Sequence, residues 1–277
     1  MMLTGVRRGA TTGTTVGVTL TDSPDWRRIV EGFSETAENY AASMAPSLRT
    51  MAVRVVQRAK LQHGERILDA GTGTGVGAAA SLTSGREVVG VDAAPGMLAI
   101  ARKEVRGARF VEADFSNLPF ATASFHVVIS VHALHFAADP VVTLAEWRRV
   151  TVPGGRLSLS VPGPRSTQAF TIYNSIYKRY GMARRIDVPT RAKIVAWARA
   201  AGWTQLDVEA NPDTAIRLPG PDTFERWMHT GSRAGATRSL SPEQFEEFAR
   251  ELMAATPVGH DGMFHIPFGT LYLTARN

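Results

Sequence analysis

The chain has no cysteine among its 277 residues. This absence excludes a disulfide framework, a thiolate zinc site and a cysteine nucleophile. No apolar run approaches the roughly eighteen residues that a membrane-spanning helix needs. Residues 1–24 carry two arginines but no continuous apolar stretch, so they lack the pattern of a secretory signal. We therefore expect a cytoplasmic protein with a disordered leader over residues 1–24.

Clusters of positive charge are also scarce, although the formal net charge is +6. The densest are the pairs Arg7-Arg8, Arg148-Arg149 and Arg184-Arg185, which acidic or apolar stretches separate. A nucleic-acid-binding chain typically gathers its positive charge into a tail or a patch. The diffuse charge therefore argues against a nucleic-acid partner and indicates solubility or attraction to an anionic partner. It does not decide between a monomer and a homodimer.

Short apolar runs alternate with helix-like stretches through the middle of the chain. The strand candidates are residues 66–70, 87–92, 109–112, 125–131 and 156–161, and the helix candidates between them are 76–83, 95–105 and 140–150. Such alternation is typical of a parallel sheet covered on both faces. With two later strand candidates, 203–208 and 264–277, it predicts an α/β fold: a doubly wound, Rossmann-like, seven-stranded and mainly parallel sheet.

Helical patterns flank and interrupt this alternation. Residues 25–63 have the spacing of N-terminal helices, and residues 164–181 and 220–256 have that of inserted helices. Ligands of doubly wound sheets bind at the carboxyl ends of the strands. We therefore expect a single domain over residues 25–277, in which the two inserts form a helical cap over that edge.

A glycine-rich stretch, D-A-G-T-G-T-G-V-G at residues 69–77, includes the end of the first strand candidate. A glycine cluster marks a tight turn or the close approach of a ligand. Gly73, Gly75 and Ala78 also fit the dinucleotide pattern G-x-G-x-x-A, which is weak evidence on its own. The neighbouring residues must therefore decide between a dinucleotide and another ligand.

An aspartate ends or follows each of the first three strand candidates. Asp69 can fix the loop or meet a cationic group, Asp92 can accept both hydroxyls of a ribose, and Asp114 can accept from an adenine amino group. A ligand with an ammonium group, a diol and an aminopurine but no phosphate is S-adenosylmethionine, whose product is S-adenosylhomocysteine. Each aspartate taken alone also fits a role without a ligand. Asp92 could cap the next helix, Asp114 could be a turn residue, and Asp69 could be a structural residue.

Residues 64–161 resemble a class I S-adenosylmethionine-dependent methyltransferase. They are similar in particular to the group that includes ubiquinone/menaquinone-biosynthesis and natural-product small-molecule methyltransferases. The matching segments are RILDAGTGTG, VVGVDAAPGMLAIAR, ARFVEADFSNLPFATASFHVVIS, ALHFAADP and RVTVPGGRLSLSVPG. They cover about a third of the chain in the expected order, whereas the N-terminal helices and the cap match only in placement.

The resemblance implies a set of cofactor-binding residues. They are Asp69, Gly71, Thr72 and Gly73 at the methionine part, Asp92, Ala93 and Met97 at the adenosine, Asp114 and Phe115 at the adenine, and Val131 near the sulfonium. Tyr40 resembles an N-terminal tyrosine that closes over the methionine moiety, and it also fits plain helix packing.

Two histidines follow the fourth strand candidate in SVHALHFAADP. Methyl transfer needs alignment, exclusion of water and sometimes a base, for which histidine is suited near neutral pH. His135 is the first candidate for a base or orienting group and His132 the second, and both also fit structural roles. No spacing places two metal ligands on one helical face, so we expect no metal.

Aromatic side chains of the cap predict a mostly apolar acceptor pocket. The acceptor-binding candidates are Tyr173, Tyr177, Trp227 and Phe268, which also fit a core of the cap itself. The sequence therefore predicts methyl transfer to a small, hydrophobic acceptor at O, C or N. The alternatives are a protein that binds the cofactor without methyl transfer (a cyclase, isomerase or regulator) and an RNA methyltransferase.

Overall fold

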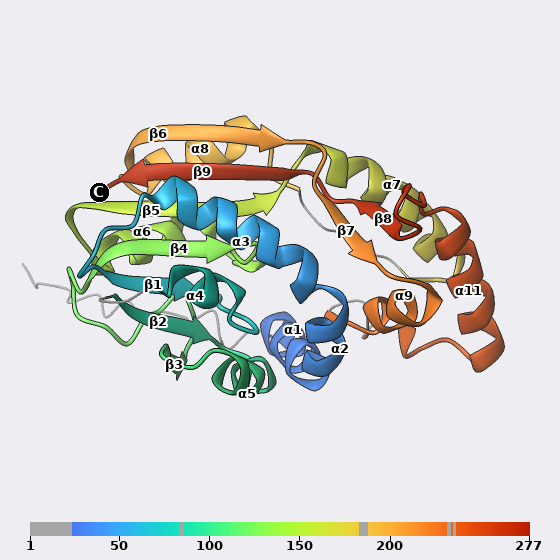
Figure 1. Cartoon of the computed structure of the whole chain (residues 1–277). Coiled ribbons are helices and arrows are strands. Elements are labelled where there is room, and N and C mark those ends of the chain that lie inside the picture. Colours follow the sequence, from blue (N-terminus) through green and yellow to red (C-terminus); the bar gives the residue numbers. More distant parts are fainter. Residues whose placement is uncertain (1–23, 83–85, 183–187, 232–233, 235–236) are drawn as a thin grey trace, which may run out of the picture.

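The central sheet has seven strands in the order β3-β2-β1-β4-β5-β9-β6 (Figure 1). The strands are β1 (Arg66–Ala70), β2 (Glu87–Asp92), β3 (Arg109–Glu112), β4 (Phe125–Val131), β5 (Thr151–Pro162), β6 (Thr204–Asn211) and β9 (Thr270–Arg276). The first five run parallel, and β9 is antiparallel to both β5 and β6. The predicted seven-stranded, mainly parallel α/β sheet is confirmed.

The computed structural model describes residues 24–82, 86–182, 188–231, 234 and 237–277. Nearly all of the predicted leader and two of the three arginine pairs lie outside these residues. No described helix combines the length and the apolar character needed to cross a membrane. The division into one domain with two inserts stays a prediction.

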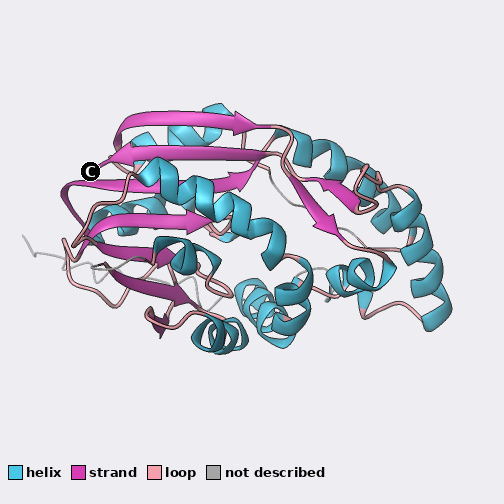
Figure 2. Ribbon diagram, in the orientation of Figure 1, coloured by secondary structure: helices cyan, strands magenta, loops and turns pink. Residues whose placement is uncertain are grey.

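Helices cover both faces of the sheet (Figure 2). Those before and between the strands are α1 (Pro24–Glu35), α2 (Ala37–Ser43), α3 (Ala45–Ala59), α4 (Val76–Ser81), α5 (Pro95–Glu104), α6 (Pro140–Val150) and α8 (Arg191–Ala200). In β4, Val127 and Ile129 pack on the side of α3 and α4, while Val128 packs on the side of α6 and α8. This alternation follows from the two-residue period of a strand and explains why β4 is apolar on both faces.

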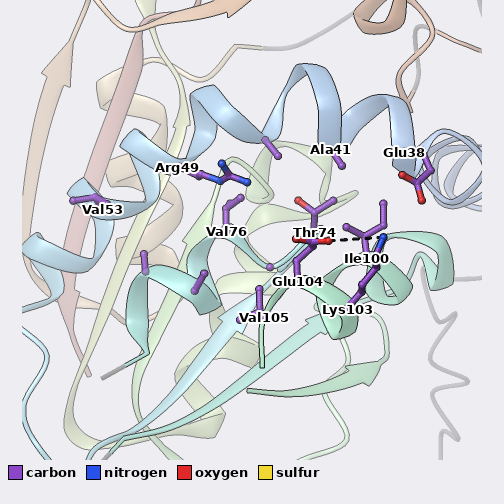
Figure 3. Close-up of a pocket in the computed structure, with 14 residues that line it drawn as sticks. Glu38, Ala41, Arg49, Val53, Thr74, Val76, Ile100, Lys103, Glu104 and Val105 are labelled. Atoms are coloured by element: carbon purple, nitrogen blue, oxygen red, sulfur yellow. Dashed lines mark ion pairs between the residues drawn. The ribbon is translucent and has the colours of Figure 1, made fainter. Parts of the chain in front are cut away.

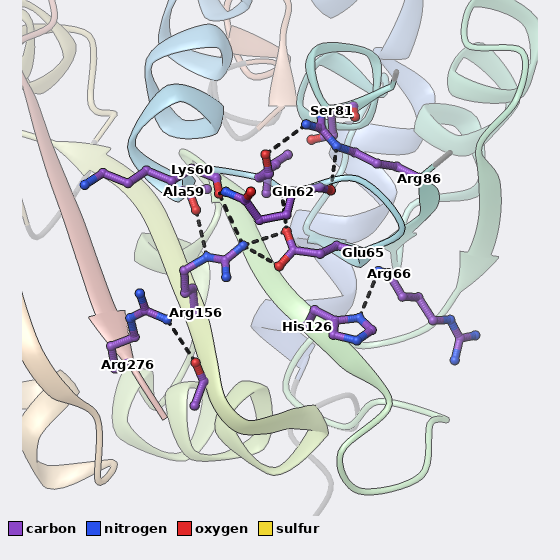
Figure 4. A network of polar contacts seen from close by, with 12 residues as sticks. Ala59, Lys60, Gln62, Glu65, Arg66, Ser81, Arg86, His126, Arg156 and Arg276 are labelled. Carbon is purple, nitrogen blue, oxygen red and sulfur yellow. Dashed lines mark hydrogen bonds and ion pairs between the residues drawn. The ribbon is translucent and has the colours of Figure 1, made fainter. Parts of the chain in front are cut away.

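The amino-terminal edge of the sheet is tied to α3 by a polar network (Figure 4). Arg156 on β5 donates 2.6 Å hydrogen bonds to both carboxylate oxygens of Glu65, and its Nε donates to the carbonyl of Ala59 at the end of α3. Glu65 is only 9% exposed, and hydrogen bonds lower its pKa against the opposing effect of burial. This pair fixes α3 at the edge opposite to the parallel strands' carboxyl ends.

The cap lies beyond the carboxyl ends of the parallel strands, where their arrowheads point in Figure 1. It contains α7 (Pro164–Arg179), α9 (Pro221–Met228), α11 (Pro242–Ala254) and a two-stranded sheet of β7 (Ala215–Leu218) and β8 (Phe264–Pro267). The helices of both predicted inserts are therefore present. Strand β7 is an element that the sequence analysis did not predict.

The prediction of one C-terminal strand over residues 264–277 is wrong, because two strands occupy this stretch. Strand β8 pairs with β7 in the cap, and β9 pairs with β5 and β6 in the main sheet. Pro267 has no N–H to donate, and Gly269 has a φ of 36°, a left-handed conformation that glycine permits. The chain thus turns from the cap into the sheet at these residues.

Candidate active site

The glycine loop after β1 turns back over the end of β2. The N–H groups of Gly71 and Thr72 donate to the carbonyl of Val91 at 2.9 and 2.8 Å, and the N–H of Gly75 donates to the carbonyl of Thr72 at 2.8 Å. Gly71, Gly73 and Gly75 all have positive φ angles, of 72°, 53° and 86°. This left-handed backbone requires glycine and exposes N–H groups instead of side chains.

Two of these glycines differ in what surrounds them. A Cβ added to Gly71 would lie 2.3 Å from the Cβ of Ala133, whereas a Cβ added to Gly73 would meet no atom within 4 Å. Gly71 is therefore required by packing. Gly73 instead borders open space. Both glycines line a cavity at the carboxyl ends of the strands.

Asp69 lies beneath the loop and is 1% exposed. Its Oδ2 accepts a 2.6 Å hydrogen bond from the hydroxyl of Thr72, and a Cβ on Gly77 would meet its Oδ1 at 2.6 Å. Burial raises the pKa of Asp69 to about 6, partly offset by the bond from Thr72. Asp69 and Thr72 are not among the residues that line the cavity. Their geometry is that of groups that fix the loop.

Asp92 lies at the end of β2 and borders the cavity together with Ala93 and Met97. Its Oδ2 accepts from the N–H of Gly73 at 2.8 Å, and its Oδ1 accepts from the N–H of Ala94 at 2.9 Å. Burial raises the pKa of Asp92. Each carboxylate oxygen has further lone pairs, so these contacts leave room for hydroxyl groups of a ligand.

Asp114 and Phe115 follow β3, and only the aromatic ring reaches the cavity. Phe115 is one of its lining residues, whereas Asp114 is 8% exposed and accepts a 2.7 Å hydrogen bond from the N–H of Ser116. The indole of Trp147 donates to the carbonyl of Phe115 at 2.8 Å. This bond fixes the backbone that carries the ring.

Helix α1 and Tyr40 of α2 cover the cavity on the opposite side. Phe33 packs edge to face on Tyr40, with ring centroids 5.9 Å apart, and on Phe136, at 5.2 Å. The N–H of Gly96 at the start of α5 donates to the hydroxyl of Ser34 at 2.9 Å. The space inside is about 70 Å³, less than a site for a nucleoside-sized ligand holds.

Val131 and His132 close the cavity at the end of β4. His132 is 6% exposed, and its ring Nε2 lies 3.3 Å from Oγ1 of Thr270. His135, on the short helix η2 (Leu134–Phe136), is not among the lining residues; its ring stacks on Phe136 at 4.0 Å. Burial lowers the pKa of His135 to about 3 and that of His132 well below its ordinary value. Both imidazoles are therefore neutral at pH 7.

The cap aromatics predicted to bind the acceptor fall into two groups. Tyr173, Tyr177 and Trp227 are between 2% and 5% exposed and belong to the cap's apolar core. The ring of Tyr173 lies 6.0 Å from that of Trp227. Phe268 instead packs on His132, with ring centroids 4.8 Å apart. Phe268 therefore adjoins a residue of the cavity wall.

A larger hollow, of about 470 Å³, lies between α2 and α3 on one side and α4 and α5 on the other (Figure 3). Its ionic contact is between Lys103 and the adjacent Glu104, 4.0 Å apart and both exposed. It borders the same glycine loop at Thr74 and Gly75, but none of the strand-end aspartates is among its lining residues. The smaller cavity is therefore the candidate active site.

Several lining residues were missed by the sequence analysis as site residues. They are Ile29, Val30 and Phe33 of α1, Ala94, Ala133 and Phe136. The α1 residues have helical apolar spacing, which predicts burial but not against what. No sequence signal marks Thr270. Among the described residues, no group of three or more His, Asp or Glu side chains could hold a metal ion.

Residues 68–159 match the family model described as a methyltransferase domain. The demethylmenaquinone methyltransferase of Thermus thermophilus is 40% identical over 156 residues, which cover 52% of this chain and 70% of that protein. The malonyl-[acyl-carrier protein] O-methyltransferase of Serratia marcescens is 31% identical over 147 residues, which cover 53% of this chain and 57% of that protein. The chain spans as little as 29% of another curated relative.

Solved structures share the fold over most of the chain. The [4+2]-cyclase SpnF has a TM-score of 0.57 at 21% identity, covering 83% of this chain and 80% of that one. A phosphoethanolamine N-methyltransferase of Haemonchus contortus in complex with S-adenosyl-L-methionine has a TM-score of 0.52 at 19% identity, covering 82% of this chain and 52% of that one. At these identities the likeness concerns the fold alone.

Proposed function

The chain belongs to the S-adenosylmethionine-dependent methyltransferase family, and on that premise we propose that it methylates a small, mostly apolar acceptor at an oxygen, carbon or nitrogen atom. The observation that carries the proposal is the cavity at the strand ends, which Gly73, Asp92, Phe115 and His132 line together. Ligands of doubly wound sheets bind at this edge.

The lining fits S-adenosylmethionine. The open space beside Gly73 would be filled by any side chain at that position, and it adjoins the Asp92 carboxylate. Under the proposal, Asp92 accepts hydrogen bonds from the ribose hydroxyls, Met97 and Phe115 pack on the adenosine, and the loop backbone borders the methionine part. Asp69 supports the loop from below through Thr72. The cofactor supplies an activated methyl group on its sulfonium.

The acceptor side of the proposal involves the end of β4. His132 closes the cavity and remains neutral, so it can accept a hydrogen bond from an acceptor hydroxyl or amine. Phe268 covers the other side of its ring. The carboxylate of Asp92 is the single charged side chain among the lining residues of this cavity in the described part of the chain. An uncharged, apolar acceptor therefore suits the wall. His135, Tyr173, Tyr177 and Trp227 act at most through these neighbours.

A protein of this fold need not transfer a methyl group, because the cyclase SpnF shares it. The two functions differ in one measurable product. Methyl transfer yields one S-adenosylhomocysteine per acceptor methylated, whereas a cyclase or isomerase consumes no cofactor. Mass spectrometry of a metabolite extract incubated with methyl-labelled cofactor therefore separates them, and a labelled product identifies the acceptor.

Cofactor binding is testable before the acceptor is known. S-adenosylhomocysteine should raise the melting temperature, since a ligand that binds only the native state stabilises it, and NAD should not. Asp92→Ala should weaken the binding of S-adenosylhomocysteine about a hundredfold or more in calorimetry, because two charge-assisted hydrogen bonds contribute roughly 1.5–3 kcal/mol each. A shift by NAD alone would refute the proposal. Near-native affinity in Asp92→Ala would reduce Asp92 to a turn residue.

A further inference from the structure

His132 has a backbone conformation that is uncommon for residues other than glycine. Its φ angle is +52°, in the left-handed region that non-glycine residues rarely adopt. The backbone is fixed there by its N–H, which donates to the carbonyl of Ser160 on β5 at 3.0 Å. Such strain persists where the surroundings determine it, and it is concentrated at functional sites. The direction of the imidazole is therefore determined by its neighbours rather than by local preference.

The two ring nitrogens of His132 have different surroundings. Nε2 lies 3.3 Å from Oγ1 of Thr270, the first residue of β9. Nδ1 is buried and has no hydrogen-bond partner in the described part of the chain. Because the ring is neutral, one nitrogen carries a hydrogen and the other a lone pair. Which is which depends on the role of the Thr270 hydroxyl.

The hydroxyl of Thr270 has partners other than the imidazole. Thr270 is fully buried, and its Oγ1 donates towards the sulfur of Met51 on α3 at 3.9 Å. Tyr272 is a second partner of the Thr270 hydroxyl. Burial raises the pKa of Tyr272 to about 12, and a hydrogen bond from Thr270 opposes this rise. A hydroxyl has one hydrogen and two lone pairs. When its hydrogen is directed to Met51 or Tyr272, Thr270 presents a lone pair to His132.

The opposite tautomer is disfavoured by the same geometry. With its hydrogen on Nδ1, His132 would bury an N–H donor without an acceptor, and Thr270 would have to turn its hydroxyl hydrogen away from Met51 to donate to Nε2. Buried N–H donors without a partner are rarer in proteins than buried acceptors with a free lone pair. The tautomer with hydrogen on Nε2 avoids both costs.

We propose that Thr270 is a positioning residue, which accepts a hydrogen bond from Nε2–H of His132 and so keeps the Nδ1 lone pair available to an O–H or N–H group of the acceptor. This inference rests on the proposed function for its purpose, though the tautomer itself does not depend on turnover. It also requires the acceptor to carry a hydrogen-bond donor, because an acceptor carboxylate would place its own lone pairs against the lone pair of Nδ1.

Nitrogen-15 NMR of the histidine-labelled protein tests the proposal, with His132→Asn used to assign the signal. The wild-type protein, with S-adenosylhomocysteine, should show an unprotonated Nδ1 and a protonated Nε2. Thr270→Val removes the hydroxyl at nearly constant volume and should shift His132 towards a mixture of tautomers, whereas Thr270→Ser should restore the wild-type spectrum. Thr256→Val is the matched control: it removes another buried hydroxyl, 2.9 Å from that of Tyr173 in the cap, and should leave His132 unchanged.

Two results would overturn the proposal. One is a wild-type His132 with its hydrogen on Nδ1, which decides the matter even if Thr270→Val fails to fold. The other is a folded Thr270→Val protein whose His132 signals match those of the wild type. Calorimetry with S-adenosylhomocysteine on the same samples keeps the two hypotheses apart, because absence of binding refutes the proposed function and leaves the tautomer measurement valid.

Discussion

Replacing Asp69 by Asn should change how the stability of the protein depends on pH. The carboxyl group is buried beneath the glycine loop, and burial raises its pKa from 3.8 to about 6. The native state therefore binds this proton more tightly than the unfolded state does. Between pH 3.8 and 6 the native state holds more protons, so Asp69 favours folding at low pH, and this contribution is lost as the pH rises through 6. Asn has no such titration.

The size of the effect follows from the shift in pKa. A shift of about two units corresponds to about 3 kcal/mol at its limit. The contribution of Asp69 to the free energy of unfolding rises by about 1.4 kcal/mol when the pH falls from 7.5 to 5. At pH 5 the carboxyl group is mostly protonated in the native state and mostly ionised in the unfolded state. His132 and His135 act in the opposite direction: their lowered pKa values make the native state lose stability as the pH falls below 6.5. Both proteins contain these histidines, so their contributions cancel when the free energy of unfolding of Asp69→Asn is subtracted from that of the wild type.

The assay is urea denaturation of the wild type and Asp69→Asn across pH 5 to 7.5. The free energy of unfolding of the wild type should gain about 1.4 kcal/mol relative to the variant towards pH 5. Thr72→Val is the control, because losing the bond that lowers the pKa of Asp69 should move the effect to higher pH. A difference that does not vary with pH would refute the reasoning and would mean that Asp69 titrates as an ordinary carboxyl group.

The remaining predictions concern the cavity itself. Gly73→Ala should weaken S-adenosylhomocysteine binding about tenfold or more at a stability cost near 1–2 kcal/mol, since the methyl enters open space at a positive φ. Gly71→Ala, the paired variant, should chiefly destabilise the fold, because its methyl would collide with Ala133. A larger loss of stability in Gly73→Ala than in Gly71→Ala would contradict the loop geometry. His132→Ala should lower kcat by about a hundred- to ten-thousandfold if the imidazole takes a proton, with the Kd of the cofactor nearly unchanged, and His135→Ala should lower kcat less. A larger loss in His135→Ala would show that the histidine outside the cavity wall is the one that matters.

The repeating part of the fold could be predicted from the sequence because its signals are local. The helix over residues 140–150 begins at a proline after Asp139, whose side chain accepts from the N–H groups of Val141 and Val142. Strands such as β4 are apolar on both faces, which is typical of a covered parallel strand. Aspartates at the ends of successive strands could be predicted to lie along one edge of the sheet, because topology brings those ends together.

The parts that could not be predicted depend on contacts between distant segments. Asp69 and Asp92 both stand at or near the end of an apolar strand in the sequence. In the structure, the carboxylate of Asp69 is enclosed by the loop and that of Asp92 borders the cavity. Likewise, the aromatic spacing in the cap is the same for a pocket wall and for a core, and packing decides for Tyr173 and Tyr177. Thr270 lies 138 residues from His132 in the chain, so no local pattern links them.

The part of the cap that contains β7, α9, α11 and β8 is attached to the sheet in a way that makes it exchangeable. Residues 212–269 leave the sheet after Asn211 of β6 and return at Thr270 of β9, and these two residues are register partners in adjacent antiparallel strands. A segment whose ends lie side by side can be replaced without changing the path of the host chain. It also lies outside the match to the family model, which ends at residue 159. A chimera with a relative's segment spliced between Asn211 and Thr270 would keep the glycine loop, His132 and Thr270 in the host. This one junction pair therefore allows the segment to be exchanged while every lining residue of the strand-end cavity stays in the host chain.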